Sequence, residues 1–379
     1  MKPGFGSSLA AFAITLVNAT LLLSQQPKMP QIESPEVKPD RTVTFRFYDP
    51  GAQKVALSLE GRPEPLPMTQ DANGVWEITS QPLEPEIYGY AFIADGVGLA
   101  DPKNPAHLKF NLLTLSNYVL VPGAMPQPWE VQDIPHGEIH HHFYKSGVVG
   151  DNRDYYVYTP PNFNPKSKTR YPVLYLLHGY SDAANGWTEV GKANYILDAL
   201  IAQGKAKPMI VVMPLGYGAP QVLQLGWQLA GHMELMQENL QKFRQMLITE
   251  LMPRVESEYP ISKKRTDHAI AGLSMGGSET LLTGLNNLDK FAYIGAFSSG
   301  GMSGDYSKEF PNLDAKANSQ IKQLYIACGT EDRLIEPNRK FKAWLKSKGV
   351  NFTDRETPGM HTWMVWRGNL VEFVPELFK

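Results

Sequence analysis

The chain has 379 residues, of which 42% are hydrophobic and 20% charged, so a single small module and a mainly disordered chain are both excluded. Lys and Arg number 36 against 38 Asp and Glu, and this balance argues against nucleic acid or an anionic membrane surface as a partner. The single cysteine, Cys328, rules out an internal disulfide and a thiolate zinc cluster, so packing must hold the fold together.

The first 25 residues have the pattern of a secretory signal peptide. Lys2 precedes an apolar run from Leu9 to Leu23, which is shorter than the roughly 20 residues of a membrane-spanning helix. No clean A-x-A cleavage site follows, so a packed N-terminal helix stays open as the alternative. We interpret 1–25 as a signal peptide and 26–39 as a linker, and we expect a secreted or periplasmic protein with no membrane partner after export.

Residues 40–121 are predicted to form a small all-β sandwich of the immunoglobulin-like kind. Apolar and polar residues alternate in short segments bounded by turn residues, and period-two alternation is typical of half-buried strands. Proline-rich residues 122–136 then predict a stiff linker, so we expect the sandwich to be separable from the rest of the chain. The predicted strands are Thr42–Phe47, Val55–Leu59, Gly74–Ile78 and Tyr88–Ile93.

From residue 137 to residue 379, apolar strands alternate with amphipathic helices. Strands that are apolar on both faces and joined by helical crossovers predict a mostly parallel sheet in an α/β domain. The predicted strands are Tyr155–Tyr158, Val173–Leu177, Met209–Met213, Ala269–Gly272, Tyr293–Phe297 and Leu324–Cys328. The predicted helices are Asn194–Gln203, Leu235–Tyr259, Ser278–Leu288 and Pro337–Lys348.

A G-x-S-x-G motif, Gly272–Gly276, directly follows a predicted strand and precedes a predicted helix. In this context the motif is a nucleophile elbow, in which small flanking residues let a strained turn hold the serine hydroxyl clear of the backbone. The alternative is an ordinary glycine-rich turn. We predict that Ser274 is a catalytic nucleophile.

A serine hydroxyl is a poor nucleophile at neutral pH, so it needs an imidazole base and a carboxylate that fixes the imidazole's tautomer. The chain order in this fold is Ser, acid, His, and His361 is the one histidine after Ser274. The acid should follow the strand Leu324–Cys328, where Glu331 and Asp332 are both available. We choose Asp332, because Asp is the usual acid.

The oxyanion of such a reaction needs two backbone donors, one of which comes from the residue after the nucleophile, Met275. The second should come from the loop after an earlier strand. His178-Gly179-Tyr180 ends such a strand, and we predict the N–H of Tyr180 as donor, with Gly179 as the alternative. His178 precedes the nucleophile in the chain, so we interpret it as a structural loop residue.

Two other groups of residues could bind a ligand. His140-His141-His142 cannot share one tetrahedral metal ion well, because neighbouring side chains on a strand point to opposite faces, and we predict no metal or organic cofactor. Trp187, Trp227 and Trp363, with Trp366, lie in or near loops after strands, where each can either line an apolar or sugar-stacking pocket or simply pack.

Four segments, in this order, resemble the putative-esterase group of α/β hydrolases, and most of all the bacterial feruloyl and acetylxylan esterases of carbohydrate esterase family one. They are Tyr171–Gly179, Ala269–Gly277, Leu288–Gly295 and Ala327–Asp332. The resemblance covers about residues 137–379 and implies an α/β-hydrolase fold with Ser274 as nucleophile, Asp332 as acid and His361 as base. Met360 stands where relatives often carry a glycine, and the region from Gly216 to Glu234 is longer, so no single acyl group is implied.

Residues 40–121 are similar to the early-set immunoglobulin-like modules of glycogen-active enzymes, through Gly74–Glu77 and Ala100–Pro102. Whether such a module binds sugar or is purely structural stays open. Together the resemblances imply an exported serine esterase that removes feruloyl or acetyl groups from plant cell-wall polysaccharide, with an acylated glycan as its substrate. Acyl transfer to a sugar, and a carbohydrate-binding protein with a decayed hydrolase domain, are the alternatives.

Overall fold

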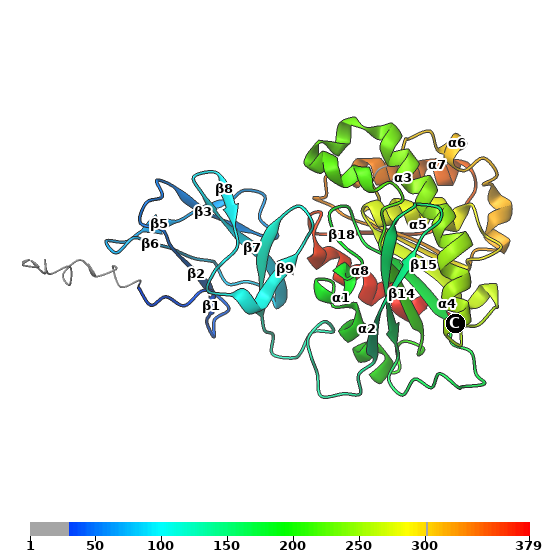
Figure 1. Ribbon diagram of the computed structural model, residues 1–379, viewed down its shortest axis with the longest axis horizontal. Coiled ribbons are helices and arrows are strands. Elements are labelled where there is room, and N and C mark those ends of the chain that lie inside the picture. The colour runs from blue at the N-terminus through cyan, green and yellow to red at the C-terminus, as the bar shows by residue number, and fades with distance from the viewer. Residues whose placement is uncertain (1–29, 301) are drawn as a thin grey trace, which may run out of the picture.

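A computed structural model describes residues 30–300 and 302–379, which form a β-sandwich and an α/β domain (Figure 1). The expected signal peptide and the first part of the expected linker lie outside the described residues. Within the described ranges, no helix combines the length and the apolar character needed to cross a membrane.

The N-terminal domain is a sandwich of two antiparallel sheets, as the alternating sequence pattern predicts. One sheet has the strand order β1-β2-β6-β5, and the other has the order β4-β3-β7-β10-β9 with β8 paired to β7. Phe45, Trp76 and Phe92 are among the side chains that form the core between the sheets. The strands are β1 (Glu36–Val37), β2 (Val43–Tyr48), β3 (Val55–Leu59), β4 (Leu66–Pro67), β5 (Thr69–Gln70), β6 (Val75–Thr79), β7 (Glu86–Ala94), β8 (Val97–Leu99), β9 (Leu108–Phe110) and β10 (Leu115–Val121), with the 3-10 turn η2 (Pro105–His107) before β9.

The sandwich begins before the residue that the sequence suggested. β1 lies inside the expected linker 26–39, and Glu36 pairs with Thr44 of β2. A strand of two residues is too short to show an alternation of apolar and polar residues, so the sequence pattern could not predict it.

The second domain contains an eight-stranded mixed sheet in the order β11-β12-β14-β13-β15-β16-β17-β18. β12 is antiparallel to both of its neighbours, and the remaining pairs are parallel, which confirms the predicted α/β-hydrolase fold class. The strands are β11 (Glu138–Lys145), β12 (Asn152–Thr159), β13 (Val173–Leu177), β14 (Ile210–Pro214), β15 (His268–Leu273), β16 (Tyr293–Phe297), β17 (Gln323–Gly329) and β18 (Thr353–Thr357). The helices are α1 (Gly186–Glu189), α2 (Ala193–Ala202), η3 (Pro220–Gly231), α3 (Met233–Met246), η4 (Leu247–Leu251), α4 (Met252–Glu258), η5 (Arg265–Asp267), α5 (Met275–Leu285), α6 (Tyr306–Glu309), η6 (Ala315–Ser319), α7 (Ile335–Ser347), α8 (Trp363–Phe373) and η7 (Val374–Glu376).

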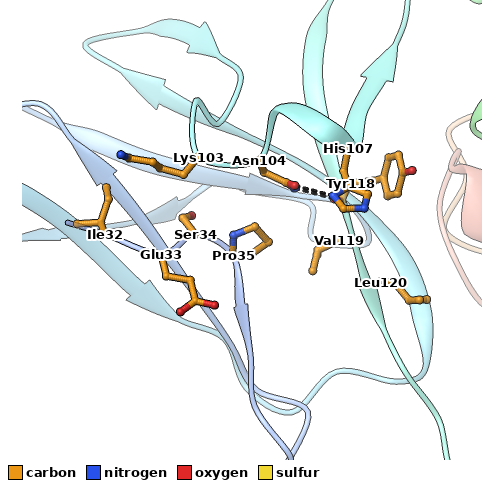
Figure 2. A pocket seen from close by; sticks show the side chains of 10 residues that line it. All are labelled: Ile32, Glu33, Ser34, Pro35, Lys103, Asn104, His107, Tyr118, Val119 and Leu120. Carbon is orange, nitrogen blue, oxygen red and sulfur yellow. Dashed lines mark hydrogen bonds between the residues drawn. The ribbon is translucent and has the colours of Figure 1, made fainter.

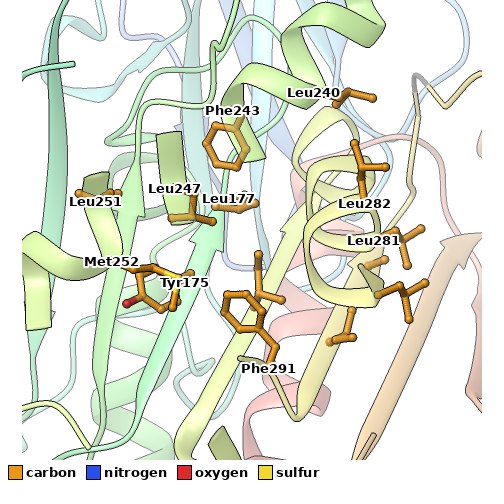
Figure 3. Packing of buried hydrophobic residues seen from close by; sticks show 14 of the residues in the cluster. Tyr175, Leu177, Leu240, Phe243, Leu247, Leu251, Met252, Leu281, Leu282 and Phe291 are labelled. Atoms are coloured by element: carbon orange, nitrogen blue, oxygen red, sulfur yellow. The ribbon is translucent and has the colours of Figure 1, made fainter. Parts of the chain in front are cut away.

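Side chains alternate along the buried strands and fill a core on each face of this sheet. On β13, Tyr175 and Leu177 belong to one cluster, whereas Leu174 and Leu176 belong to the other. Helices α3, α4, α5 and α7 cover the first face, where Phe243 packs among the leucines of Figure 3. Helices α1, α2 and α8 cover the second face. Helices therefore cover both faces. β14 and β15 lie on opposite sides of β13, and the carboxyl end of such a strand is where α/β proteins commonly bind their ligands.

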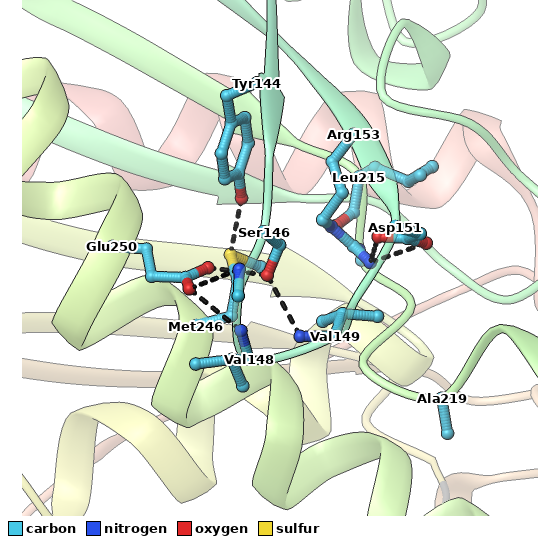
Figure 4. Close-up of polar contacts among 12 residues, drawn as sticks. Tyr144, Ser146, Val148, Val149, Asp151, Arg153, Leu215, Ala219, Met246 and Glu250 are labelled. Carbon is cyan, nitrogen blue, oxygen red and sulfur yellow. Dashed lines mark hydrogen bonds and ion pairs between the residues drawn. The ribbon is translucent and has the colours of Figure 1, made fainter.

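The helical segment predicted over Leu235–Tyr259 is not one regular helix, because the π-helical turn η4 joins α3 to α4. Pro253, in the first turn of α4, has no N–H and crowds the preceding turn, so the regular ladder cannot continue through it. The wider turn places Glu250 against the β11–β12 hairpin. There its carboxylate accepts hydrogen bonds from the Ser146 hydroxyl and from the two N–H groups that follow (Figure 4).

The two domains share a buried interface, so the sandwich is not the separable module that the sequence suggested. Arg367 of α8 is 1% exposed, and it donates hydrogen bonds to the Glu86 carboxylate at 3.1 Å and to the carbonyl of Ile87 at 2.7 Å, both on β7. Its remaining bond goes to the carbonyl of Val190 at 3.0 Å. Met364 of α8 also packs against the sandwich core. A proline-rich linker marks a domain boundary, but it carries no information about the surfaces on either side.

We expect Glu86→Ala to lower the free energy of unfolding by about 3 kcal/mol, because it removes the carboxylate that hydrogen-bonds to the buried Arg367 guanidinium. Urea unfolding at pH 8 measures the change. Glu84→Ala is the matched control, since Glu84 forms an ion pair with Arg41 at the surface and such pairs contribute little. Equal effects of the two substitutions would contradict a buried ion pair at the interface.

Candidate active site

Ser274 occupies a strained turn between β15 and α5. Its backbone has φ 52° and ψ −114°, a region that residues other than glycine rarely adopt. The chain is so crowded here that a Cβ on Gly272 would lie 2.5 Å from the Gly276 oxygen, and a Cβ on Gly276 would lie 2.4 Å from the His178 oxygen. The flanking residues must therefore be glycines. The turn leaves the hydroxyl of Ser274 at the carboxyl end of the sheet.

The loops after β17 and β18 bring Asp332 and His361 to this serine. His361 Nε2 lies 2.9 Å from Ser274 Oγ, and His361 Nδ1 lies 2.8 Å from Asp332 Oδ2. Burial opposes the ionisation of Asp332, but the hydrogen bond and charge interaction with His361 outweigh it and hold the pKa of Asp332 below its usual range. Asp332 is buried, whereas Glu331 is exposed. Of the two carboxylates that the sequence left open, Asp332 is the one that contacts the imidazole.

Tyr180 and Met275, the two residues predicted as oxyanion donors, flank the serine. Met275 is the first residue of α5, so its N–H has no acceptor within the helix. Gly179 lies against the elbow, since a Cβ there would be 3.4 Å from Ser274 Cβ. The hydroxyl of Tyr180 lies 2.7 Å from the carbonyl oxygen of Gly226, which ties the loop after β13 to η3. Gly179, which precedes Tyr180, and Met275 therefore lie beside Ser274 on two separate elements.

A cavity of about 270 Å³ opens at Ser274 and His361, and its walls come from both domains. Trp227 of η3 is 62% exposed at this cavity, and its ring meets that of Tyr180 edge-on at 5.9 Å. Trp363 lines the same cavity. The lining residues are Glu60, Lys109, Asn111, Thr114, Ser116, Gly179, Tyr180, Ser181, Asp182, Trp227, Leu273, Ser274, Arg333, His361, Thr362, Trp363 and Trp366.

Sequence reasoning missed the residues that the sandwich contributes to this cavity. Lys109 and Ser116 come from β9 and β10, Asn111 and Thr114 come from the turn between these strands, and Glu60 follows β3. These polar residues are isolated along the chain and form no recognisable motif, and they lie in a domain that we expected to be separate from the active site. One pattern in the sequence could have pointed to Lys109. It lies between two apolar residues in β9, so its side chain faces the side of the strand opposite to theirs.

Trp187 packs in the core and does not line the cavity, whereas the sequence left a substrate-binding role open for it. Its side chain is fully buried, and its indole N–H donates to the carbonyl of Leu177 at 2.9 Å. A tryptophan in a loop after a strand can face either way, and helix α1 turns this one into the core.

Burial raises the pKa of the Cys328 thiol to about 12, as expected for an unreactive core cysteine.

His178 is held neutral in the core beside the site. Burial lowers its pKa to about 4. Its Nδ1 donates to the carbonyl of Gly179, and its Nε2 accepts the N–H of Gly216, so it braces the loop and cannot also reach Ser274. Elsewhere, the rings of His140, His141 and His142 hydrogen-bond to Thr159, Asp154 and Tyr259 respectively.

A second cavity, of about 500 Å³, lies within the sandwich (Figure 2). Asn104, which lines it, contacts the His107 ring at 2.7 Å and the Tyr90 hydroxyl at 3.0 Å through its amide. The ring of Tyr118, which lines it, is packed against His107 and lies beneath the ammonium group of Lys192. One face of the Tyr118 ring is therefore occupied by a side chain of the α/β domain.

A serine on a strained elbow at the end of a central parallel strand is the defining arrangement of the α/β hydrolases. Residues 146–377 match the sequence family described as Putative esterase. Since this match covers more than half of the chain, the protein belongs to that family. Residues 34–109 match carbohydrate-binding module 48, the isoamylase N-terminal domain.

Similarity to one curated relative extends over both domains. An endo-1,4-beta-xylanase/feruloyl esterase of Xylanibacter ruminicola is 32% identical over 359 residues, which make up 92% of this chain and 46% of that protein. An acetyl esterase of Caldicellulosiruptor saccharolyticus is 26% identical over 227 residues, covering 51% of this chain and 78% of that protein. This chain therefore spans about half the length of the first relative.

Two solved structures share the fold. The enterobactin esterase of Shigella flexneri has a TM-score of 0.67 at 20% identity and covers 89% of this chain and 93% of its own. A ferulic acid esterase of the anaerobic fungus Anaeromyces mucronatus has a TM-score of 0.56 at 23% identity and covers 67% of this chain and 96% of its own.

Asp182 in the cavity wall gives a test by pH. Burial raises its pKa to about 7 in the folded protein, against about 4 in an unfolded chain. Between about pH 4 and about pH 7 the carboxyl of Asp182 is therefore protonated in the folded protein but not in the unfolded chain. The stabilisation that this proton gives the folded state is complete below about pH 4 and is lost as the pH rises towards about 7.

We expect the free energy of unfolding of the wild type, relative to Asp182→Asn, to fall by about 2 kcal/mol between pH 5 and 7. Urea unfolding at several pH values measures it, with Asp289→Asn as the surface control because the Asp289 side chain is 75% exposed. Parallel curves for wild type and Asp182→Asn would show that Asp182 keeps an ordinary pKa.

Proposed function

We propose that this protein is a serine esterase that cleaves carboxylic esters through an acyl-enzyme, with Ser274, His361 and Asp332 as its catalytic residues. The observation that carries the proposal is the unbroken set of contacts from Asp332 Oδ2 through the His361 ring to Ser274 Oγ, at 2.8 and 2.9 Å. These are hydrogen-bond distances in the order that base-assisted attack requires. Membership of the putative-esterase family supports the same reaction class.

The reaction follows from the positions of these groups. Ser274 Oγ attacks the ester carbonyl while His361 Nε2 takes its proton, and the N–H groups of Tyr180 and Met275 stabilise the oxyanion. The protonated imidazole then gives its proton to the departing alkoxide, which leaves as an alcohol. Water, deprotonated by His361, then attacks the acyl-enzyme, and the imidazolium returns this proton to Ser274 Oγ as the acid departs. Asp332 accepts from Nδ1 throughout, which leaves Nε2 to take and return the proton in each half of the reaction.

The proposed substrate is a feruloyl or acetyl ester on plant cell-wall polysaccharide, and the proposed location is outside the cytoplasm. The relatives named for feruloyl and acetyl esterase activity support the acyl group. The match of the sandwich to a carbohydrate-binding module supports a glycan. The apolar run near the N-terminus supports export.

Ser274→Ala should reduce kcat on p-nitrophenyl acetate and methyl ferulate by about a thousandfold or more, because the oxyanion donors alone give little catalysis. The reaction rate under saturating substrate measures this. His361→Ala should be equally severe, and the two losses should not add, since both groups act in one proton transfer. A Ser274→Ala protein that keeps a tenth of wild-type kcat would refute the assignment.

Asp332→Asn should lower kcat by several orders of magnitude, because an amide at this position favours the wrong imidazole tautomer. Glu331→Gln is the matched control and should cost little, since Glu331 is exposed. Steady-state kinetics on the same esters compares the two. The reverse ranking would transfer the role of the acid to Glu331.

A further inference from the structure

Glu60, which follows β3 in the sandwich, places a carboxylate at the start of helix α8 in the other domain. Its Oε1 accepts a hydrogen bond from the N–H of Trp363 at 2.9 Å, and Trp363 is the first residue of α8. The helix has no cap of its own, because the side chain of Thr362 makes no capping bond and the first turn contains no acidic residue. A carboxylate at a helix N-terminus satisfies a free N–H and interacts favourably with the helix dipole.

The sandwich holds this carboxylate in place. Glu60 Oε2 accepts the N–H of Gly89 at 2.7 Å and lies 3.3 Å from the ammonium group of Lys109, and the side chain of Glu60 is only 9% exposed. Burial opposes ionisation, but the charges of Lys109 and Arg367 and the two N–H groups hold the pKa of Glu60 below its usual range. The cap is therefore charged and rigid.

The start of α8 in turn positions the imidazole. His361 lies two residues before Trp363, and its ring packs edge-on against Trp366 in the first turn of α8 at 4.9 Å. The Trp366 indole is itself fixed by a hydrogen bond to the Ser298 hydroxyl at 3.1 Å. A shift of the first turn of α8 would therefore move His361 relative to Ser274.

A second contact reaches the other catalytic loop. Asn111 of the sandwich donates from its amide to the Ser181 hydroxyl at 2.8 Å and to the Asp182 carboxylate at 3.1 Å, and the N–H of Leu112 donates to the carbonyl of Ser181 at 2.7 Å. Ser181 has φ 73°, so this loop is strained and needs outside support. Tyr180, the residue before it, is a proposed oxyanion donor.

We propose that the sandwich is a positioning element of the active site, with Glu60 fixing the base His361 through α8 and Asn111 fixing the loop that carries Tyr180. The proposal rests on the esterase function proposed above. It gives the sandwich a role in the chemical step itself, which is separate from any binding of sugar. Neither residue needs to touch the substrate, because each acts through a loop of the α/β domain.

The test uses the full chain with Glu60→Ala and Asn111→Ala. Each should lower kcat on p-nitrophenyl acetate by about 10- to 100-fold while KM changes by less than about 3-fold, because misplacing a catalytic group affects the chemical step more than binding. Covalent labelling of Ser274 by a small fluorophosphonate should slow by a similar factor. Labelling measures the reactivity of Ser274 and requires no glycan, so a loss of sugar contacts would leave it unchanged.

Three further variants separate positioning from stability. Glu64→Ala, in the same loop and exposed, should label at the wild-type rate. Val43→Ala, in the sandwich core and fully buried, should lower the unfolding midpoint and yet leave the labelling rate of folded protein unchanged. Glu60→Gln preserves the shape of the side chain if Glu60→Ala does not fold. It should label several-fold more slowly than wild type, since the two N–H groups bind different oxygens of Glu60 and the NH2 group that replaces one of them cannot accept a hydrogen bond.

The proposal is overturned if Glu60→Gln and Asn111→Ala label at the wild-type rate, or if KM rises while kcat is unchanged, which would make these residues substrate contacts. It is also overturned if Val43→Ala slows labelling as much as the substitutions at Glu60. In each of these cases the wild type still labels at Ser274. Failure of the esterase proposal gives a different result, in which the wild type itself is not labelled or Ser274→Ala keeps its activity.

Discussion

The strained turn at Ser274 is the constraint on which the rest of the active site depends. The backbone of Ser274 has φ 52°, a conformation that costs free energy for a residue with a Cβ. The surrounding structure must therefore hold the backbone in this conformation. The N–H of Ser274 donates to the carbonyl of Phe297 at the end of β16, and its carbonyl accepts the N–H of Gly300 just beyond. The neighbouring parallel strand therefore fixes the elbow, and the same close packing excludes any side chain at Gly272 and Gly276.

The loops that complete the site are also held from outside the α/β domain. The base loop is bounded by β18 and α8, and the oxyanion loop by β13 and α1. The sandwich makes hydrogen bonds beside both loops: Glu60 accepts from the N–H of Trp363 at the end of the base loop, and Asn111 donates to Ser181 in the oxyanion loop. The buried ion pair between Glu86 and Arg367 joins the same two domains. The domain matched to a carbohydrate-binding module thus contacts the segments that carry the proposed catalytic residues, and its removal would expose the Arg367 guanidinium and take away its carboxylate partner.

The sequence predicted the fold class and the central residues because each rests on a local pattern. Apolar runs indicated β13, β15, β16 and β17, since strands buried on both faces need continuous apolar residues. The G-x-S-x-G motif and the order of residues along the chain selected Ser274 and His361, and the structure brings these side chains within hydrogen-bond distance. The choice between Glu331 and Asp332 was less secure, because neighbours in a loop differ only in the direction in which they point.

The sequence by itself determined the order of elements, the strained turn and the residue types available for acid-base chemistry, because these depend on neighbours along the chain. Tertiary structure alone decided that Trp187 is buried while Trp227 is exposed at the cavity, and that Glu60 and Asn111 reach the catalytic loops. Glu60 bonds to Trp363 across 303 positions of sequence. Such a contact is fixed by how two complete domains pack, and the packing depends on surfaces that exist only after each domain has folded.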